Sequence, residues 1–175
     1  MKTYGKSENV VEERDFTEQE TAQQAAQNEE DFIKGLIEAA DFKSDERKRV
    51  EIVRNGKALF AFEIRPLTED DYNSARKKHS KKIKNKRLGI VVTDEVDAVK
   101  YRDQLIYQAT VPQDRKKLWD NQKVWSGLID KGIEIISPLD VIEFTLKAGE
   151  KDQIIDLIDK ISGFDTDLEE TAKNS

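Results

Sequence analysis

The apolar side chains of this chain first follow a regular spacing near residue 29. Five of them recur at the positions of one helix face: Phe32, Ile33, Leu36, Ile37 and Ala40. Three acidic residues at 29–31 suit the positive end of such a helix. The pattern predicts a short amphipathic helix from Glu29 to about Phe42.

Between residues 49 and 65 the apolar period changes to two. Polar residues alternate there with the apolar residues Val50, Ile52, Phe60, Phe62 and Ile64. Asn55-Gly56 lies between the two runs and tolerates the positive φ angles of a type I′ turn. Pro66 has no N–H for a strand ladder and ends the second run. This segment is predicted to be a β-hairpin with one buried face.

Two helices are predicted between Pro66 and Pro112. Thr68 precedes three acidic residues, which is typical of a helix start. This helix is expected to run into a basic segment, with Tyr72, Ala75, His79 and Ile83 on one face. Thr93 is the predicted N-cap of the next helix, whose face holds Ala98, Tyr101, Leu105 and Ala109. Val111-Pro112 ends it, because a residue before proline avoids the α region.

Three further helices are predicted after Pro112. The first, Asp114–Ile129, is expected to bury Leu118, Trp119, Trp125 and Leu128. The second starts at Ser137-Pro138, carries Leu139, Ile142 and Leu146, and is expected to stop at Gly149. The third, Glu150–Ser162, buries Ile154, Leu157, Ile158 and Ile161. Gly163 is its expected C′ residue, and Phe164 follows where a Schellman motif places a hydrophobic contact.

These patterns predict a mainly α-helical chain with a small β-hairpin, in the α+β class. A bundle of short helices follows an N-terminal hairpin in this architecture. The helical domain is expected at residues 29–164. Residues 1–28 and 165–175 are expected to be flexible acidic ends, because they are polar and carry no apolar stripe.

The charge of the chain supports this division. The chain has 175 residues and a formal net charge of -6. Residues 1–28 carry three basic and six acidic side chains, and residues 165–175 carry one basic and four acidic. The ends therefore account for the net charge, and residues 29–164 are neutral overall.

Composition excludes several kinds of site. Without cysteine the chain has no disulfide, thiolate metal site or cysteine nucleophile, and His79 alone makes no zinc cluster. No cofactor or metal is expected. No apolar run approaches the roughly 18 residues of a membrane span, and no signal peptide opens the chain, so a cytosolic location is expected. No nucleotide-binding, zinc-protease or hydrolase motif occurs, and the carboxylates lie at helix starts or in the ends, so no enzyme is predicted.

One basic run lies inside the neutral middle. It contains eight cations and no acid: Arg76, Lys77, Lys78, Lys81, Lys82, Lys84, Lys86 and Arg87. These side chains are candidate polyanion contacts, because clustered Lys and Arg neutralise phosphates. No aromatic residue is interleaved for base stacking, so a solvated helix end and loop is the favoured interpretation, and nucleic acid is not the favoured partner.

Four apolar residues are the candidate protein contacts. Phe32 and Leu36 belong to the first amphipathic stripe. Trp119 and Trp125 are six residues apart, so on a continuous helix they point to different faces. Either one is core and the other is an anchor for a partner, or both belong to the core.

Three segments, in this order after a polar N-terminal region, carry a family resemblance. Phe62–Tyr72 reads F-E-I-R-P-L-T-E-D-D-Y, Asp94–Val111 reads D-E-V-D-A-V-K-Y-R-D-Q-L-I-Y-Q-A-T-V, and Leu146–Asp165 reads L-K-A-G-E-K-D-Q-I-I-D-L-I-D-K-I-S-G-F-D. The chain resembles, over about residues 45–175, the XkdN-like tail assembly chaperones of long-tailed phages and PBSX-type prophages of Gram-positive hosts. The most specific parts are R-P-L-T-E-x-D-Y and the L-K-A-G-E…S-G-F-D block.

The resemblance implies a non-enzymatic helical protein of the host cytoplasm. It implies that the protein coats the tape measure protein before the tail tube forms and is absent from the finished virion. A longer frameshifted product would recruit the tail tube protein, and Ala172-Lys173-Asn174 is compatible with a slippery A-AAA-AAC heptamer. A homo-oligomer is compatible with this role. The alternatives are a nucleic-acid-binding accessory protein that uses residues 76–87, and a structural virion component.

Overall fold

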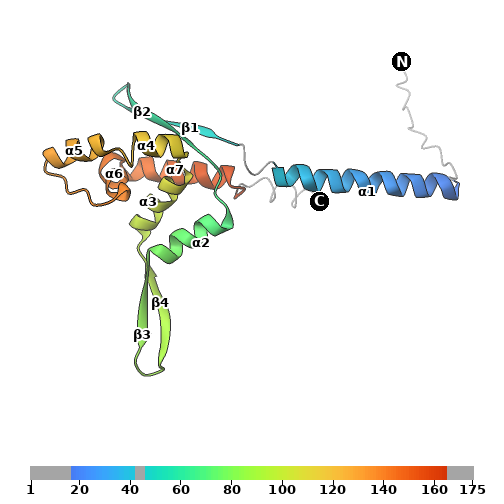
Figure 1. The fold of residues 1–175 in the computed structure, drawn as a ribbon, viewed down its shortest axis with the longest axis horizontal. Coiled ribbons are helices and arrows are strands. Elements are labelled where there is room, and N and C mark those ends of the chain that lie inside the picture. Colours follow the sequence, from blue (N-terminus) through green and yellow to red (C-terminus); the bar gives the residue numbers. More distant parts are fainter. Residues whose placement is uncertain (1–16, 42–45, 165–175) are drawn as a thin grey trace, which may run out of the picture. The chain divides into compact units, whose positions relative to one another are not determined.

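The computed structural model describes residues 17–41 and 46–164 (Figure 1). The chain divides into two compact units, Met1–Phe42 and Lys43–Ser175. The first unit contains α1 (Glu18–Asp41). The second contains, in chain order, β1 (Lys48–Arg54), β2 (Lys57–Ile64), α2 (Glu69–Lys78), β3 (Ser80–Asn85), β4 (Ile90–Val96), α3 (Ala98–Ala109), α4 (Pro112–Lys117), α5 (Gln122–Asp130), α6 (Pro138–Thr145) and α7 (Ala148–Ile161). The described residues are thus mainly helical with two antiparallel hairpins, which confirms the predicted α+β class.

Helix α1 begins at Glu18, earlier than the predicted start at Glu29. A reciprocal cap explains this start: the Glu20 amide donates to Thr17 Oγ1 (3.2 Å), and the Thr17 amide donates to Glu20 Oε2 (2.9 Å). The Gln-, Ala- and Glu-rich residues that follow have high helix propensity without an apolar stripe. Of the ends expected to be flexible, residues 1–28 and 165–175, positions 1–16 and 165–175 lie outside the described residues.

The first hairpin forms as predicted. Asn55 and Gly56 both have positive φ, 52° and 74°, as a type I′ turn requires. The register pairs Val50 with Phe62, and these side chains lie on the buried face. The C-terminal end of this hairpin also pairs with the end of α3 and the residues after it, because the Arg65 amide donates to the Ala109 carbonyl (2.8 Å) and the Val111 amide donates to the Glu63 carbonyl (3.0 Å). The hairpin is therefore joined to the helices by backbone hydrogen bonds as well as by its core face.

A second hairpin corrects the prediction for residues 80–96, where we expected a helix end, a loop and a helix start at Thr93. Helix α2 ends at Lys78, and strands β3 and β4 pair in register from Lys82 with Thr93 to Asn85 with Ile90. The β-branched run at residues 90–93 and the alternation of lysine with Ile83 favour strands. Helix α3 consequently starts at Ala98, with Asp97 as its N-cap. Ile83 does not share a helix face with Tyr72, because it lies on β3.

The prediction of a single helix over Asp114–Ile129 is wrong, because the segment forms two helices, α4 and α5, with a break between them. Asn121 starts the second piece, with its side-chain oxygen accepting from the Lys123 amide (3.0 Å). The interruption turns Trp119 into the core, where its side chain is 1% exposed. Leu118, Trp125 and Leu128 are half-buried against that core.

Helices α6 and α7 carry the predicted buried residues Ile142, Ile154, Ile158 and Ile161. Gly149 does not end α6; it lies in the first turn of α7, which starts at Ala148. At the other end Gly163 has φ 94°, and the Phe164 amide donates to the Asp159 carbonyl (3.0 Å). This is the predicted Schellman motif. The Phe164 ring meets the Tyr72 ring edge-on, with centroids 5.4 Å apart.

A bidentate ion pair joins the first hairpin to α7. Arg54 Nε and Nη2 donate to the two carboxylate oxygens of Glu150 at 2.9 and 2.7 Å, and Nη2 also donates to the Thr145 carbonyl (2.6 Å). The hydrogen bonds from Arg54 lower the pKa of Glu150 from 4.5 to about 2.

This depressed pKa predicts an acid-sensitive contribution to stability. The contribution is present above pH 4.5 and is lost as the pH falls toward 2, because the unfolded carboxylate binds protons first. Glu150→Gln is therefore expected to be less stable than the unmodified chain at pH 6, with the difference shrinking by pH 3. Urea unfolding across this range measures it, with exposed Glu134→Gln as the control. A difference that is constant with pH would contradict the assignment.

Candidate functional site

Helix α1 carries an apolar stripe that the described structure leaves exposed. Phe32, Ile33, Leu36 and Ile37 are 70%, 48%, 59% and 59% exposed. Phe32 and Leu36 are one helical turn apart and so lie on the same face. An amphipathic helix presents such a stripe to an apolar groove or to another helix. Partner binding through Phe32 and Leu36 stays a prediction, and their exposure makes it physically possible.

The two tryptophans have different surroundings. The Trp119 ring meets those of Phe60 and Phe62 edge-on, with centroids 6.1 and 5.4 Å apart, and its Nε1 donates to Thr110 Oγ1 (2.9 Å). Burial of this ring leaves no exposed surface for a partner to bind. Trp125 is half-buried and donates from Nε1 to the Trp119 carbonyl (2.7 Å). The sequence-based choice between core and anchor is thus decided for Trp119, and Trp125 retains accessible surface.

The basic run does not form one surface. Arg76, Lys77 and Lys78 lie in the last turn of α2, Lys81, Lys82 and Lys84 lie on β3, and Lys86 and Arg87 lie in the turn after β3. The Arg76 guanidinium lies 6.0 Å from the centroid of the Tyr101 ring. Within the described side chains, none of the eight cations forms an ion pair. The cations therefore divide between a helix end and a projecting hairpin.

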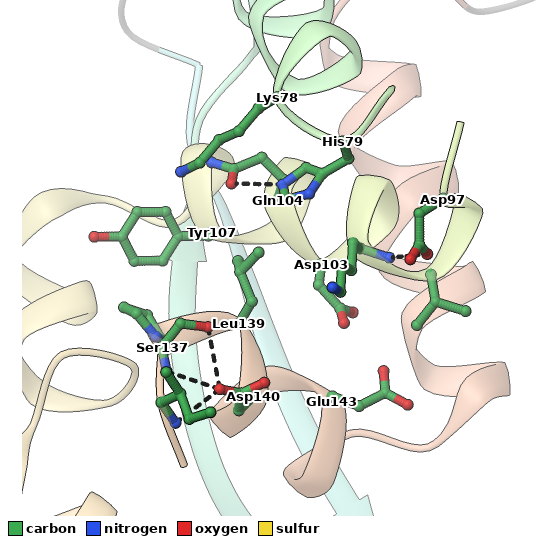
Figure 2. Close-up of a pocket in the computed structure, with 14 residues that line it drawn as sticks. Lys78, His79, Asp97, Asp103, Gln104, Tyr107, Ser137, Leu139, Asp140 and Glu143 are labelled. Carbon is green, nitrogen blue, oxygen red and sulfur yellow. Dashed lines mark hydrogen bonds between the residues drawn. The ribbon is translucent and has the colours of Figure 1, made fainter. Parts of the chain in front are cut away.

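A cleft of about 730 Å³ lies between the end of α2, helix α3 and the start of α6 (Figure 2). On one side, His79 Nε2 lies 3.1 Å from Gln104 Oε1 (Figure 2). On the opposite side, Asp140 accepts hydrogen bonds from the amides of Ile136 (2.9 Å) and Ser137 (2.7 Å). His79 is half-buried.

Two acidic residues of the cleft, Asp97 and Asp140, serve the starts of helices. Asp97 caps α3 by accepting from the Lys100 amide (3.1 Å), and Asp140 caps α6. The Ser137 hydroxyl also donates to Asp140 Oδ2 within this cap (3.2 Å). In the described ranges no group of three or more metal-binding side chains converges. No helix in those ranges has the length and hydropathy of a bilayer-spanning segment.

A buried ion cluster beneath the cleft was missed by the sequence analysis. Lys151 of α7 is 3% exposed, and its Nζ lies 2.8 Å from Asp103 Oδ1 of α3. Lys151 also pairs with Glu143 of α6. Asp103 of α3 and Glu143 of α6 both line the cleft (Figure 2). The cluster therefore links three helices at the centre of the second unit.

Charge and burial oppose each other in this cluster. Burial, reinforced by the neighbouring Glu143 charge, raises the pKa of Asp103 to about 6, although Lys151 opposes the shift. The hydrogen bond from Lys151 lowers the pKa of Glu143. The sequence contained a signal for this site: Lys151 is three residues before Ile154 and seven before Ile158, on the apolar face of its helix. A lysine at such a position needs a buried acidic partner.

Comparison with known proteins identifies one family. Residues 30–174 match the family model described as "Phage XkdN-like tail assembly chaperone protein, TAC". Comparison with curated proteins and with solved structures gave no significant match. The match spans the C-terminal half of α1 and every element of the second unit. The chain therefore belongs to the XkdN-like family of phage tail assembly chaperones.

Proposed function

We propose that this protein binds the tape measure protein and keeps it soluble and competent for assembly while the phage tail forms. The exposed stripe of α1 is the observation that carries the proposal. A stripe of Phe, Ile and Leu on an amphipathic helix matches the apolar face of a long helical client, and covering both faces removes apolar surface from water. The charged residues elsewhere on the chain keep such a complex soluble.

The proposal includes the setting in which the protein acts. The chaperone works in the bacterial host cytoplasm, without catalysis, and leaves before the virion is complete. A longer product of ribosomal slippage near Ala172-Lys173-Asn174 adds a contact to the tail tube protein. Absence of the chain from purified virions distinguishes this role from that of a structural virion component.

Co-expression with the tape measure protein tests the proposed client contact. The unmodified chain is expected to hold the client in the soluble fraction and to elute with it. Phe32→Ala with Leu36→Ala is expected to weaken the complex by about tenfold or more, because buried aromatic and aliphatic anchors dominate interfaces.

The control for this experiment lies on the same helix. Lys34→Ala with Glu38→Ala removes an exposed pair 3.9 Å apart and leaves the stripe intact, so binding is expected to change little. If the client stayed insoluble with the unmodified chain, the proposed function would be wrong. If both double variants bound the client equally well, the client contact would lie elsewhere.

A further inference from the structure

The hairpin of β3 and β4, here called the arm (residues 80–96), projects away from α2 and α3 (Figure 1). Its turn is closed by Asn85, whose Oδ1 accepts from the amides of Arg87 (3.0 Å) and Leu88 (3.3 Å), and by Gly89 at φ 65°. The base is tied by a hydrogen bond from the Asp97 amide to the His79 carbonyl (3.0 Å). The arm therefore has a defined turn and base.

The register sorts the side chains of the arm onto two different faces. Ile83 pairs with Val92, and Asn85 pairs with Ile90, which places Ile83, Ile90 and Val92 together. Lys84 pairs with Val91, and Lys82 shares that opposite face. Ile83, Ile90 and Val92 are 50%, 52% and 46% exposed, so water reaches the apolar face. A two-stranded hairpin with both faces in water is only marginally stable, and a third strand or a packed surface would stabilise it.

The outer edge of β3 is the open edge of the arm that carries lysines. The sheet has two strands, so β3 and β4 each have a single hydrogen-bonded neighbour and an open edge. Every second residue of β3 therefore turns its N–H and C=O toward an open edge. Along β3 the order of side chains is Lys82, Ile83, Lys84. The two lysines therefore lie on one face of the arm and Ile83 lies on the other.

This alternation selects among strands that pair with β3. A second copy of β3 would bring lysines close together, and like charges on paired strands destabilise a sheet. A strand that alternates acidic and apolar residues places carboxylates beside Lys82 and Lys84 and an apolar side chain beside Ile83. Such a strand would pair its carboxylates with the lysines on one face, cover Ile83 on the other face, and hydrogen-bond to the open backbone edge of β3.

We propose that the arm binds an extended acidic segment of a protein partner, which adds to the outer edge of β3 as a third strand. The segment alternates carboxylate with apolar side chains. This inference concerns a surface distinct from the α1 stripe, so its failure would leave the proposed client contact of α1 untouched.

The apolar residues of the arm favour a protein over a nucleic acid. Leu88 and Val91, in addition to the apolar face, are 67% and 63% exposed, and phosphates offer such side chains no favourable contact. Residues 80–96 contain no aromatic side chain on which a base could stack. A polyanion would use the lysines and leave the isoleucines and valines in water.

Labelled peptides test the proposal on the full-length chain by fluorescence anisotropy. A short peptide that alternates glutamate with valine is expected to bind. A peptide of the same composition with its glutamates in one block, and an alternating peptide with N-methylated backbone amides, are expected to bind much more weakly. Lys82→Glu with Lys84→Glu is expected to weaken binding of the alternating peptide by about tenfold.

A charge swap separates binding from damage to the arm. The Lys82→Glu, Lys84→Glu variant is expected to bind a peptide that alternates lysine with valine, which the unmodified chain does not bind. Lys116→Glu with Lys123→Glu makes the same charge change on α4 and α5 and is expected to leave binding unchanged. Equal binding of the blocked or N-methylated peptide would overturn strand addition. Binding of generic duplex DNA alone, with a steep salt dependence, would overturn the protein partner in favour of a polyanion.

Discussion

Replacing Lys151 with methionine is expected to destabilise the fold by about 3–5 kcal/mol, because it leaves a buried carboxylate without its cation. The lysine is 3% exposed and lies 2.8 Å from Asp103, which is itself 2% exposed. Methionine fills a similar volume, so the loss reports charge and not packing. Urea unfolding at neutral pH measures it.

The pH dependence of the stability loss tests whether Asp103 is its cause. The ionised form of Asp103 is the one that lacks a partner in Lys151→Met, and burial already raises its pKa to about 6. The stability deficit is therefore expected to shrink as the pH falls toward 5 and to grow toward pH 8. Adding Asp103→Leu is expected to restore much of the stability. An exposed control, Lys131→Met, is expected to change the free energy of unfolding by less than about 0.5 kcal/mol.

Trp119→Ala is expected to lower the free energy of unfolding by a similar amount, about 3–5 kcal/mol, because it leaves a cavity in the core. The ring packs between the aromatic side chains of β2 and donates a hydrogen bond to Thr110, so alanine loses buried area, ring contacts and a polar partner. Thermal or urea unfolding measures the change.

Two milder variants, one at Trp119 and one at Trp125, provide comparisons for Trp119→Ala. Trp119→Phe keeps an aromatic ring but loses the hydrogen bond, and is expected to cost about 1–2 kcal/mol. Trp125→Phe removes a hydrogen bond from a half-buried position, so its effect is expected to be smaller than that of Trp119→Ala. If Trp119→Ala were no worse than Trp125→Phe, the core assignment of Trp119 would be wrong.

The elements that the sequence predicted correctly are those with local signals. Asn55-Gly56 specifies a turn by tolerating positive φ, and Thr68 and Ser137 satisfy amides within one turn of their own helices. Gly163 ends α7 for the same local reason. Each signal acts between residues a few positions apart, so the sequence itself determined the α+β class and most helix positions.

The features that the sequence left undecided depend on residues far apart in the chain. Trp119 interrupts a helical pattern because its ring is buried against Phe60 and Phe62, which periodicity within residues 114–129 does not reveal. The lysines of the arm resemble a solvated helix end until strand pairing with residues 90–96 assigns them to one edge. Lys151 is buried only because Asp103 and Glu143 arrive from two other helices to neutralise it. In all three cases, the free energy that decides the structure comes from contacts that exist only in the folded chain.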